Sequence, residues 1–568
     1  MKKIIPVIVA IVLIIVIAAV GFGTKVLEKY SYSKERADLT EYFGNEGSDD
    51  VPVILQDEMI EEHAKIFDNI CYFDIATVHK YFNGRFYEDK SESRLLYTTP
   101  DTILENPVGT GTLISLDADF SESQTEYEYT ISRYEGDMLY IAADFVKEYA
   151  NFSYELFTEP NHMQVYTKWE SRQEAQITKD TQVRYQGGIK SEILTDVKKG
   201  DQVVVLEEME TWTKVKTKDA FIGYVENKRL GEKSEETPEP VTDYVEPVYE
   251  ANTRDHKINL GWHVIGGVGG NDTLESVVAQ TKGLNVISPT WFTLMGNEGD
   301  FNSYASAAYV ANAHEMGLEV WALLGNVDSV DVDMYEVLGK TGNRRRLIQS
   351  AVAVAIDYKI DGLNIDFENL SLDAGEPFVQ FIRELSIPCR KYGIVLSVDN
   401  YVPMNHTDHY NRAEQGVAAD YVIIMGYDEH YNGSDKAGSV ASIDFVENGI
   451  INTVKEVPAE KVINALPFYT RIWQTGAGGI ESQAVGMEMA AAYVADHGIE
   501  TRWDETTCQN YGEFQDGDTL CQVWLEDAES VKVKLTIMEK YGIAGVAAWR
   551  LGFETADIWD VIGEYMNR

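Results

Sequence analysis

The stretch Asp361-Gly362-Leu363-Asn364-Ile365-Asp366-Phe367-Glu368 decides the fold of this chain. In an extended strand successive side chains point to opposite faces, so Asn364, Asp366 and Glu368 share one face and three apolar side chains share the other. A strand with one polar and one apolar face fits a closed parallel barrel, in which helices cover the apolar face. The last carboxylate would then lie at the C-terminal end of the strand, where such barrels carry their active sites.

Two carboxyl groups on one face suit the cleavage of a glycosidic bond. That reaction needs a carboxylic acid that stays protonated near neutral pH and a second group that stabilises positive charge at the sugar carbon. Glu368 fits the acid, because a free Glu titrates at about 4.3 and the like charge of Asp366, or the loss of water, would raise its pKa. The alternative is a purely structural role, in which each buried polar group must find a partner.

The octapeptide resembles the Asp-Gly-x-Asp-x-Asp-x-Glu motif of glycoside hydrolase family 18, the chitinase and N-acetylglucosaminidase family. The resemblance covers residues 255–568. It implies a retaining glycosidase in which Glu368 is the acid and the substrate's own 2-acetamido oxygen is the nucleophile, oriented by Asp366. Asp361 and Asn364 are expected to belong to the substrate-binding set. The chemistry requires no cofactor and no metal.

Asn364 departs from the family motif, which has an Asp at this place. The change removes one proton-sharing partner of Asp366 but leaves a hydrogen-bond donor and acceptor there, so it affects the expected pH dependence more than the activity. The sequence Asn-Ile-Asp-Phe-Glu is similar to the spore-cortex and peptidoglycan-directed branch of the family. This similarity favours peptidoglycan over chitin as the substrate, and it is an analogy.

The pattern of residues 255–568 predicts an α/β fold, a (β/α)8 TIM barrel with an inserted α+β lobe. Alternating strand and helix signals argue for a closed parallel barrel. The expected strands are 257–264, 284–294, 318–325, 361–368, 395–401, 421–428, 462–469 and 543–551, with helices such as 304–316, 345–358 and 377–392 between them. The gap from 471 to 528 is longer than a crossover requires and is expected to hold the lobe.

Further groups are expected at the mouth of this barrel. Met425-Gly426-Tyr427-Asp428 resembles the family's Met-x-Tyr-Asp motif, which implies that Tyr427 holds the acetamido group and that Asp428 contacts the sugar, with Met425 facing inward. Trp549 follows the small residues Gly545 and Ala547 on one face and could stack on a sugar. Trp291, Tyr469 and Asn400 lie at other strand ends, where core packing or capping is the alternative to sugar contact.

Composition places the chain outside the nucleic-acid-binding class. Its 568 residues suggest three or four domains, and 93 acidic against 48 basic residues give a net charge of −45, which would repel phosphates.

From Ile4 to Thr24 no residue is charged, and about 20 apolar residues span roughly 30 Å. This apolar segment, with Lys2 and Lys3 on the cytoplasmic side, predicts a transmembrane signal anchor over 1–27. The protein would then cross the membrane once, with the remainder of the chain extracellular. The alternative is a cleaved signal peptide and a secreted protein.

The four cysteines do not have the spacing of a zinc site. Cys508 and Cys521 flank a stretch that resembles a hairpin, so they could face each other and form a disulfide outside the cytoplasm; two free buried thiols are the alternative. The acidic run 328–333 lacks the closing Gly and Glu of a calcium loop and is interpreted as a solvated turn.

The N-terminal half predicts two smaller domains. After a charged stalk at 28–50, residues 70–81 are echoed at 137–149, which indicates an α+β repeat domain over 51–172. The repeat resembles the N-terminal-like domain of copper amine oxidases, without implying copper, because His79 and His162 are not equivalent in the two copies. Short alternating strands over 176–231 resemble a bacterial SH3-like barrel, and 232–254 is an acidic, Pro-bearing linker.

Together these patterns predict an exported, retaining glycosidase that cleaves β-1,4 bonds of N-acetylglucosamine-containing polymers. Its partners would be peptidoglycan or chitin, a cell-wall peptide bound by the SH3-like domain, and the membrane at the N-terminal helix. A spacer role is the alternative for the SH3-like domain. The alternative for the whole chain is a weakly active glycan-binding scaffold or a surface sensor on the same fold.

Overall fold

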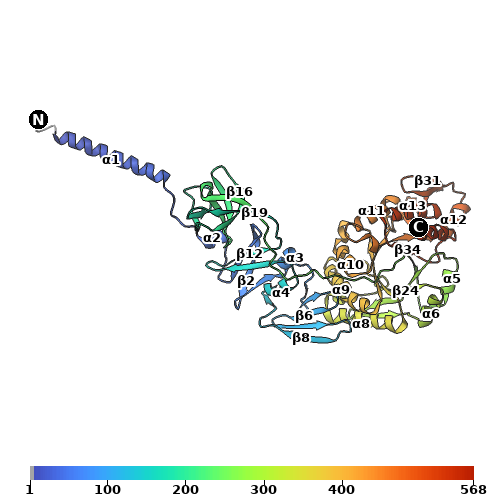
Figure 1. The fold of residues 1–568 in the computed structure, drawn as a ribbon. Coiled ribbons are helices and arrows are strands. Elements are labelled where there is room, and N and C mark those ends of the chain that lie inside the picture. Colours follow the sequence, from blue (N-terminus) through green and yellow to red (C-terminus); the bar gives the residue numbers. More distant parts are fainter. Residues whose placement is uncertain (1–4) are drawn as a thin grey trace. The chain divides into compact units, whose positions relative to one another are not determined.

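The computed structural model describes residues 5–568, which form two compact units. The first unit contains the chain up to residue 86 together with 108–112 and 127–246. The second unit contains 87–107, 113–126 and 247–568. Figure 1 shows the strands and helices of each unit coloured along the chain.

The first helix of the chain is α1 (Ile5–Tyr30). Over residues 5–568, no helix combines the length and the apolar character that a membrane crossing needs, so the predicted transmembrane helix is not supported. Lys2 and Lys3, the residues expected on the cytoplasmic side, lie outside the described residues.

The internal repeat of the first unit is a repeated strand-and-helix pair. The first copy is β3 (Ile70–Asp74) with α3 (Ile75–Tyr81), and the second is β10 (Met138–Ala142) with α4 (Ala143–Glu148). The two strands pair antiparallel, with Phe73 opposite Ile141. Five more strands complete this sheet: β1 (Asp50–Leu55), β2 (Glu58–Phe67), β9 (Ser132–Glu135), β11 (Ser153–Phe157) and β12 (His162–Tyr166).

The second sheet of this unit contains the strands expected for an SH3-like domain. They are β14 (Thr181–Arg184), β15 (Ile193–Val197), β16 (Gln202–Glu208), β17 (Trp212–Lys216) and β18 (Ile222–Glu226), flanked by β13 (Arg172–Ile177) and β19 (Leu230–Glu236). The segment expected to be a stalk is folded against this domain: α2 (Leu39–Phe43) inserts Phe43 beside His162 and Phe221. The stalk was predicted from the charged residues of this segment. The segment folds instead because Phe43 packs against other aromatic rings.

The second unit is built on the predicted barrel. Its eight parallel strands are β20 (Ile258–His263), β21 (Val286–Pro289), β24 (Glu319–Gly325), β25 (Gly362–Asp366), β26 (Val395–Tyr401), β27 (Tyr421–Met425), β28 (Val462–Pro467) and β34 (Gly545–Trp549). The barrel closes because β34 pairs with both β28 and β20. The expected second strand is divided, since β22 (Phe292–Met295) leaves β21 and forms a hairpin with β23 (Asp300–Ser303).

Alternation along the barrel strands divides the core into two layers. Trp262, Leu323 and Ile423 belong to a buried cluster inside the barrel, whereas Leu363, Ile365 and their neighbours pack in the layer between strands and helices. The surrounding helices are α5 (Leu274–Val278), α6 (Ala307–Glu315), α7 (Met334–Gly339), α8 (Thr341–Tyr358), α9 (Gly375–Tyr392), α10 (Arg412–Ala418), α11 (Ile443–Thr453), α13 (Ala528–Tyr541) and α14 (Ile558–Met566). The barrel is therefore a filled core, and its chemistry is confined to the strand ends.

The inserted lobe is an antiparallel sheet with one helix, as expected from the long gap. Its elements are β29 (Tyr469–Gly476), β30 (Gly479–Gly486), α12 (Met487–Asp496), β31 (Arg502–Asp504), β32 (Gln509–Asp516) and β33 (Thr519–Leu525). The predicted Cys508–Cys521 disulfide is wrong, because both thiols are free. In the β32–β33 register Cys521 lies opposite Phe514, and Cys508 precedes that point by six positions, or about 20 Å of strand.

A small sheet from the N-terminal half belongs to the barrel unit rather than to the repeat unit. It contains β4 (Tyr87–Asp89), β5 (Arg94–Thr98), β6 (Ile103–Pro107), β7 (Thr112–Leu116) and β8 (Glu122–Glu126). Asp89 Oδ2 accepts hydrogen bonds from the backbone N and the hydroxyl of Thr341 at 2.7 and 2.6 Å. Tyr87 and Leu96 pack with Ile387 of α9. The boundary differs from 51–172 because these contacts join segments that are far apart in sequence.

Breaking the buried ion pair between α8 and α9 should strongly destabilise this unit. Arg344 Nη2 lies 2.8 Å from Glu384 Oε1, and both side chains are almost fully buried. Glu384→Ala would leave the guanidinium charge buried without its partner, so we expect unfolding free energy to fall by about 3–5 kcal/mol. Urea unfolding followed by tryptophan fluorescence measures this. Glu539→Ala, which removes the exposed partner of Arg568, is the control and should change little; equal effects of the two substitutions would contradict the prediction.

Candidate active site

Strand β25 places the polar residues of the octapeptide as the alternation predicts. Leu363 and Ile365 are buried among the helices, and Asn364 and Asp366 point into the barrel. Glu368 lies two residues beyond Asp366, just past the end of the strand. Asn326, which follows β24, fixes this turn, because its Oδ1 accepts from the backbone N of Glu368 at 2.8 Å and its Nδ2 donates to the carbonyl at 2.9 Å.

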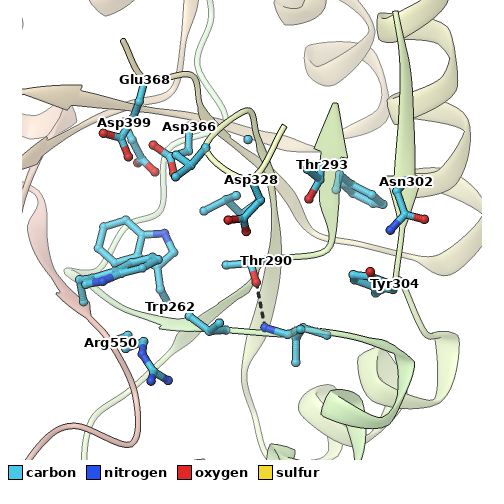
Figure 2. A pocket seen from close by; sticks show the side chains of 18 of the residues that line it. Trp262, Thr290, Thr293, Asn302, Tyr304, Asp328, Asp366, Glu368, Asp399 and Arg550 are labelled. Carbon is cyan, nitrogen blue, oxygen red and sulfur yellow. Dashed lines mark hydrogen bonds between the residues drawn. The ribbon is translucent and has the colours of Figure 1, made fainter. Parts of the chain in front are cut away.

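A cavity of about 620 Å³ opens at the C-terminal ends of the barrel strands. Its walls come from several strands, and the side chains that carry the chemistry discussed below are Trp262, Asp366, Glu368, Asp399, Tyr427 and Trp549. Figure 2 shows the labelled carboxyl groups of Asp366, Glu368 and Asp399 near one another. The C-terminal face is where parallel barrels hold their active sites, so the location agrees with the sequence prediction.

Glu368 is set up to carry a proton. Burial raises its pKa, while a 2.6 Å hydrogen bond from the Tyr401 hydroxyl to Glu368 Oε2 lowers it, and the nearby charge of Asp428 raises it. The net direction is upward. A carboxyl group with a raised pKa can remain protonated near neutral pH, as a general acid must.

Asp366 shares this environment with a third carboxyl group. Burial and the charge of Glu368 raise the pKa of Asp366, and its Oδ1 is buried without a hydrogen-bond partner in the described part of the chain. Burial and the charge of Asp366 likewise raise the pKa of Asp399. Because the charges interact, protonation of these groups is coupled, and the cluster holds protons that isolated carboxylates would release.

Asn364 connects the cluster to the barrel interior. Its Nδ2 donates to Asp399 Oδ1 at 2.8 Å and to Ser397 Oγ at 3.1 Å. Its Oδ1 accepts from Trp262 Nε1 at 2.9 Å. These bonds fix the orientation of the Asn364 amide and use both its nitrogen and its oxygen. Asn364 therefore supports Asp399 from the barrel interior instead of facing the cavity.

Met425, the last residue of β27, and Tyr427, two residues beyond it, line the cavity, as predicted from their alternation. Burial raises the pKa of Tyr427, which keeps its hydroxyl protonated and able to donate a hydrogen bond. Asp428 adopts a left-handed backbone conformation with φ of 57°, and its Oδ1 accepts a 2.6 Å hydrogen bond from the Tyr469 hydroxyl. Tyr469 therefore positions Asp428 and does not itself line the cavity.

Trp549 lies at the end of β34 with Ala547 and Gly545 below it in the barrel. It lines the cavity together with Trp262, and the two ring centroids are 5.8 Å apart at an interplanar angle of 59°. Two indole rings at one end of the cavity offer an apolar surface for a sugar ring. Trp262 was not predicted, although it is the penultimate residue of the first barrel strand.

Besides Asn364 and Tyr469, three further predicted sugar contacts do not line the cavity. Asp361 lies at the opposite end of β25, where its Oδ2 accepts from His314 Nε2 at 2.7 Å and from the backbone N of Val320 at 2.8 Å. Trp291 is fully buried and its Nε1 donates to Asn271 Oδ1 at 2.8 Å. Asn400 faces the helices, where it exchanges hydrogen bonds with Gln415. The first is at the wrong end of its strand, and the other two belong to the core.

Over residues 5–568, no group of three or more His, Cys, Asp and Glu side chains has an arrangement suited to hold a metal ion. Burial and the charges of neighbouring carboxylates raise the pKa values of Glu368 and Asp399, whereas the hydrogen bonds donated by the Tyr401 hydroxyl and the Asn364 amide lower them. In this arrangement one carboxyl group can donate a proton while a second carboxyl group close by changes its own charge.

The hydrogen bond from Tyr401 should tune the pH range of the acid. Tyr401 is kept protonated by burial and by the charge of Glu368, so it donates, and this bond favours the charged form of Glu368. Tyr401→Phe removes it and raises the pKa of Glu368. The acid form then persists to higher pH, so the alkaline limb of the kcat/KM profile is expected to move upward.

The pH profile of hydrolysis measures this shift, with Tyr392→Phe as the control because Tyr392 is an exposed tyrosine that also bonds a carboxylate, that of Asp119. An alkaline limb that stays in place, or moves to lower pH, would show that Tyr401 does not set the protonation of Glu368.

Comparison with known proteins agrees with this geometry. "Glycosyl hydrolases family 18" matches residues 271–554, half of the chain, and "Bacterial SH3 domain" matches residues 179–231. The chain is 24% identical over 292 residues to the "Uncharacterized glycosylase YvbX" of Bacillus subtilis (strain 168), covering 49% of this chain and 84% of that protein. It is 26% identical over 234 residues to the "Cortical fragment-lytic enzyme" of the same organism, covering 39% of this chain and 54% of that enzyme.

The chain thus spans about half the length of the cortical fragment-lytic enzyme that it matches. Among solved structures, the spore cortex-lytic enzyme SleL of Bacillus cereus has 19% sequence identity and a TM-score of 0.50, with 58% of this chain and 78% of that chain covered. This similarity supports the barrel fold. The family match, with the carboxyl cluster at the barrel mouth, shows that the chain is a glycoside hydrolase and belongs to glycosyl hydrolases family 18.

Proposed function

We propose that this protein is a retaining glycosidase that cleaves β-1,4 bonds of N-acetylglucosamine-containing polymers, with peptidoglycan as the preferred substrate and chitin as the second. The observation that carries the proposal is the cavity in which Glu368, Asp366 and Tyr427 meet at the mouth of the barrel. It unites a carboxyl group of raised pKa, a second buried carboxyl group and a protonated phenol. These are the groups that cleavage assisted by a neighbouring amide requires.

The proposed reaction begins with proton transfer from Glu368 to the leaving glycosidic oxygen. As the bond to the sugar carbon breaks, the carbonyl oxygen of the substrate's 2-acetamido group attacks that carbon and forms an oxazolinium ion. Asp366 accepts a hydrogen bond from the amide N–H, and the Tyr427 hydroxyl donates to the amide oxygen. Both contacts hold the amide in place, and the Asp366 charge stabilises the cation.

The second half of the proposed reaction returns the proton. Glu368, now a carboxylate, removes a proton from a water molecule, which attacks the sugar carbon and opens the oxazolinium ion. Two displacements at one carbon retain its configuration. The unpartnered Oδ1 of Asp366 supports this assignment, because a buried acceptor without a partner is costly unless a substrate donor completes it.

Peptidoglycan is favoured over chitin by two features outside the cluster. The chain contains a bacterial SH3 domain, and such domains often bind cell-wall peptides. The relatives include enzymes named for the lysis of cortical fragments. Because its substrate lies outside the cytoplasm, we propose that the protein acts at the cell surface, either membrane-associated or secreted. Fractionation of cells into membrane, wall and medium tests that location.

Digestion of purified peptidoglycan and colloidal chitin side by side, followed by mass spectrometry of the products, tests the substrate. We expect more soluble product from peptidoglycan, with N-acetylglucosamine at the new reducing end. N-acetylmuramic acid at that end, or release from chitin alone, would contradict the preference. Binding of both polymers without any product would favour a glycan-binding scaffold.

A further inference from the structure

The cavity contains a single cation among its lining residues. Four of these residues carry carboxyl groups, namely Asp328, Asp366, Glu368 and Asp399, and Arg550 is the one basic residue. Figure 2 shows Arg550 well separated from Asp366, Glu368 and Asp399. A guanidinium group placed away from the reacting carboxyl groups does not serve the proton transfer, so it needs another explanation.

Arg550 has its hydrogen-bonding edge free. The carbon of its guanidinium group lies 3.8 Å from the centroid of the Phe553 ring, so the flat face of the cation packs on the ring. Within residues 5–568 the guanidinium makes no ion pair with a carboxylate. Burial is the one influence that lowers its pKa, and no neighbouring carboxylate raises it. Stacking through the face leaves the planar N–H donors available for a ligand.

The buried arginines Arg344 and Arg383 of this unit, in contrast, have ion-pair partners. Arg344 is paired with Glu384 at 2.8 Å, and Arg383 is paired with Glu414 at 2.9 Å. The neighbouring His263 does not compete for an anion, because burial and the Arg550 charge lower its pKa to about 4 and its two ring nitrogens are occupied by Tyr309 and Thr273. Arg550 is thus a partly buried cation that has no ion-pair partner among residues 5–568.

Space for a substituent exists beside this cation. Strands β20 and β34 are adjacent in the barrel, so the residues that follow β20 border the same end of the cavity as Arg550. Val264, Ile265 and Gly266 line this end. An added side-chain carbon at Gly266 would meet no atom within 4 Å, which shows that the wall is open there.

We propose that Arg550 binds a carboxylate of the substrate and so selects acidic glycans over neutral ones. The carboxylate would belong either to a lactyl ether on a sugar or to a peptide attached to the glycan. A guanidinium fork matches a carboxylate in a bidentate geometry, and the surrounding negative charge of the cavity would otherwise repel such a substrate. This inference rests on the proposed function, because it names the substrate class of the same cavity.

The test compares acidic and neutral substrates with the Arg550→Gln and Arg550→Lys variants. The four substrates are a chitooligosaccharide, a glycan of equal length with free lactyl carboxylates, the same glycan with those carboxylates converted to amides, and a glycan that carries peptides. We expect Arg550→Gln to lower the ratio of kcat/KM for acidic over neutral substrate about tenfold or more. Arg550→Lys should restore part of that ratio, because it keeps the charge but loses the fork.

Two further arms separate the sources of the carboxylate. If the lactyl group is the ligand, its conversion to an amide removes the effect of Arg550→Gln; if the peptide is the ligand, only the peptide-bearing glycan responds. Arg346→Gln is the matched control, since Arg346 is an exposed arginine of α8 that does not line the cavity.

An acidic-to-neutral ratio that is equal in the parent and in Arg550→Gln, with hydrolysis intact, would overturn the inference and leave the proposed function standing. If the parent hydrolyses none of these glycans, the proposed function fails. In that case calorimetric binding of the acidic and neutral glycans decides the role of Arg550, because the same loss of preference is expected in their affinities.

Discussion

Glu368→Gln is expected to lower kcat on N-acetylglucosamine-containing glycans by about 10²–10⁴-fold, the contribution of a well-placed general acid. Glutamine preserves the size of the side chain and can still accept the hydrogen bond from Tyr401, but it has no proton to give to the leaving oxygen. KM should change little, because the defect lies in the transition state and not in ground-state binding. Steady-state hydrolysis of a chitooligosaccharide series measures both constants.

Glu315→Gln provides the control for this substitution, since Glu315 is an exposed glutamate at the end of α6, away from the cavity. A substrate with an activated leaving group, such as a nitrophenol, refines the test. It departs without protonation, so its bond cleavage should be much less sensitive to Glu368→Gln. A variant that hydrolyses natural glycans at the parent rate would exclude Glu368 as the acid.

Asp366→Asn is expected to reduce kcat by about 10²–10³-fold, the usual cost of removing one preorganised group that stabilises a charged transition state. Asp366 is buried, and its Oδ1 has no partner in the described part of the chain, so its interaction with the substrate amide is made in a site of low polarity. Asparagine keeps an oxygen acceptor but removes the negative charge that would face the oxazolinium ion.

The effect of Asp366→Asn should depend on the acetamido group. Hydrolysis of N-acetylated and de-N-acetylated oligosaccharides shows this. Asp366→Asn should lose activity on the acetylated glycan, whereas the parent enzyme should already be slow on the de-N-acetylated glycan. Asp328→Asn, which changes a cavity carboxylate on a different strand connection, serves as the control for a general loss of negative charge. Equal losses in the two variants would indicate a nonspecific electrostatic effect.

Much of the barrel could be predicted from local patterns. The eight parallel strands correspond to the predicted ranges, because each combines an apolar face with flanking turn residues. The division of the second strand was missed, since the apolar run 284–294 does not reveal that β21 ends at Pro289 and that β22, which still pairs with β24, begins a hairpin. The sheet formed by β4 to β8 was placed in the wrong unit, because its partners on α8 and α9 lie more than 200 positions away in sequence.

Strand alternation predicted which side chains face the barrel interior, whereas side chains chosen by residue type alone were misplaced. Asp399 shares a face with Ser397, which contacts Asn364, so counting along β26 would have placed it in the cluster. The same count places Asn400 on the helix face, where it was found. Asp361 was included as a member of the motif, although seven positions of strand, about 23 Å, separate it from Glu368.

The SH3-like strands and the strand-and-helix repeat of the first unit were likewise predictable from alternation. Side-chain partners that come from distant segments were not. The hydroxyl of Tyr401 reaches Glu368 across two neighbouring strands, and Trp262 reaches Asn364 across the barrel interior. The pairing of β25 with β26 brings the first two residues together, and the closed barrel brings the second two together, so no local pattern could indicate either pair.

The central claim is that the substrate's own amide, held between Asp366 and Tyr427, displaces the leaving group that Glu368 protonates. Proton NMR of the first product formed from a β-linked chitooligosaccharide or peptidoglycan glycan tests it most directly, recorded before mutarotation equilibrates the anomers. The account predicts that the new reducing end appears as the β anomer. Initial release of the α anomer would mean direct attack by water and would contradict the account.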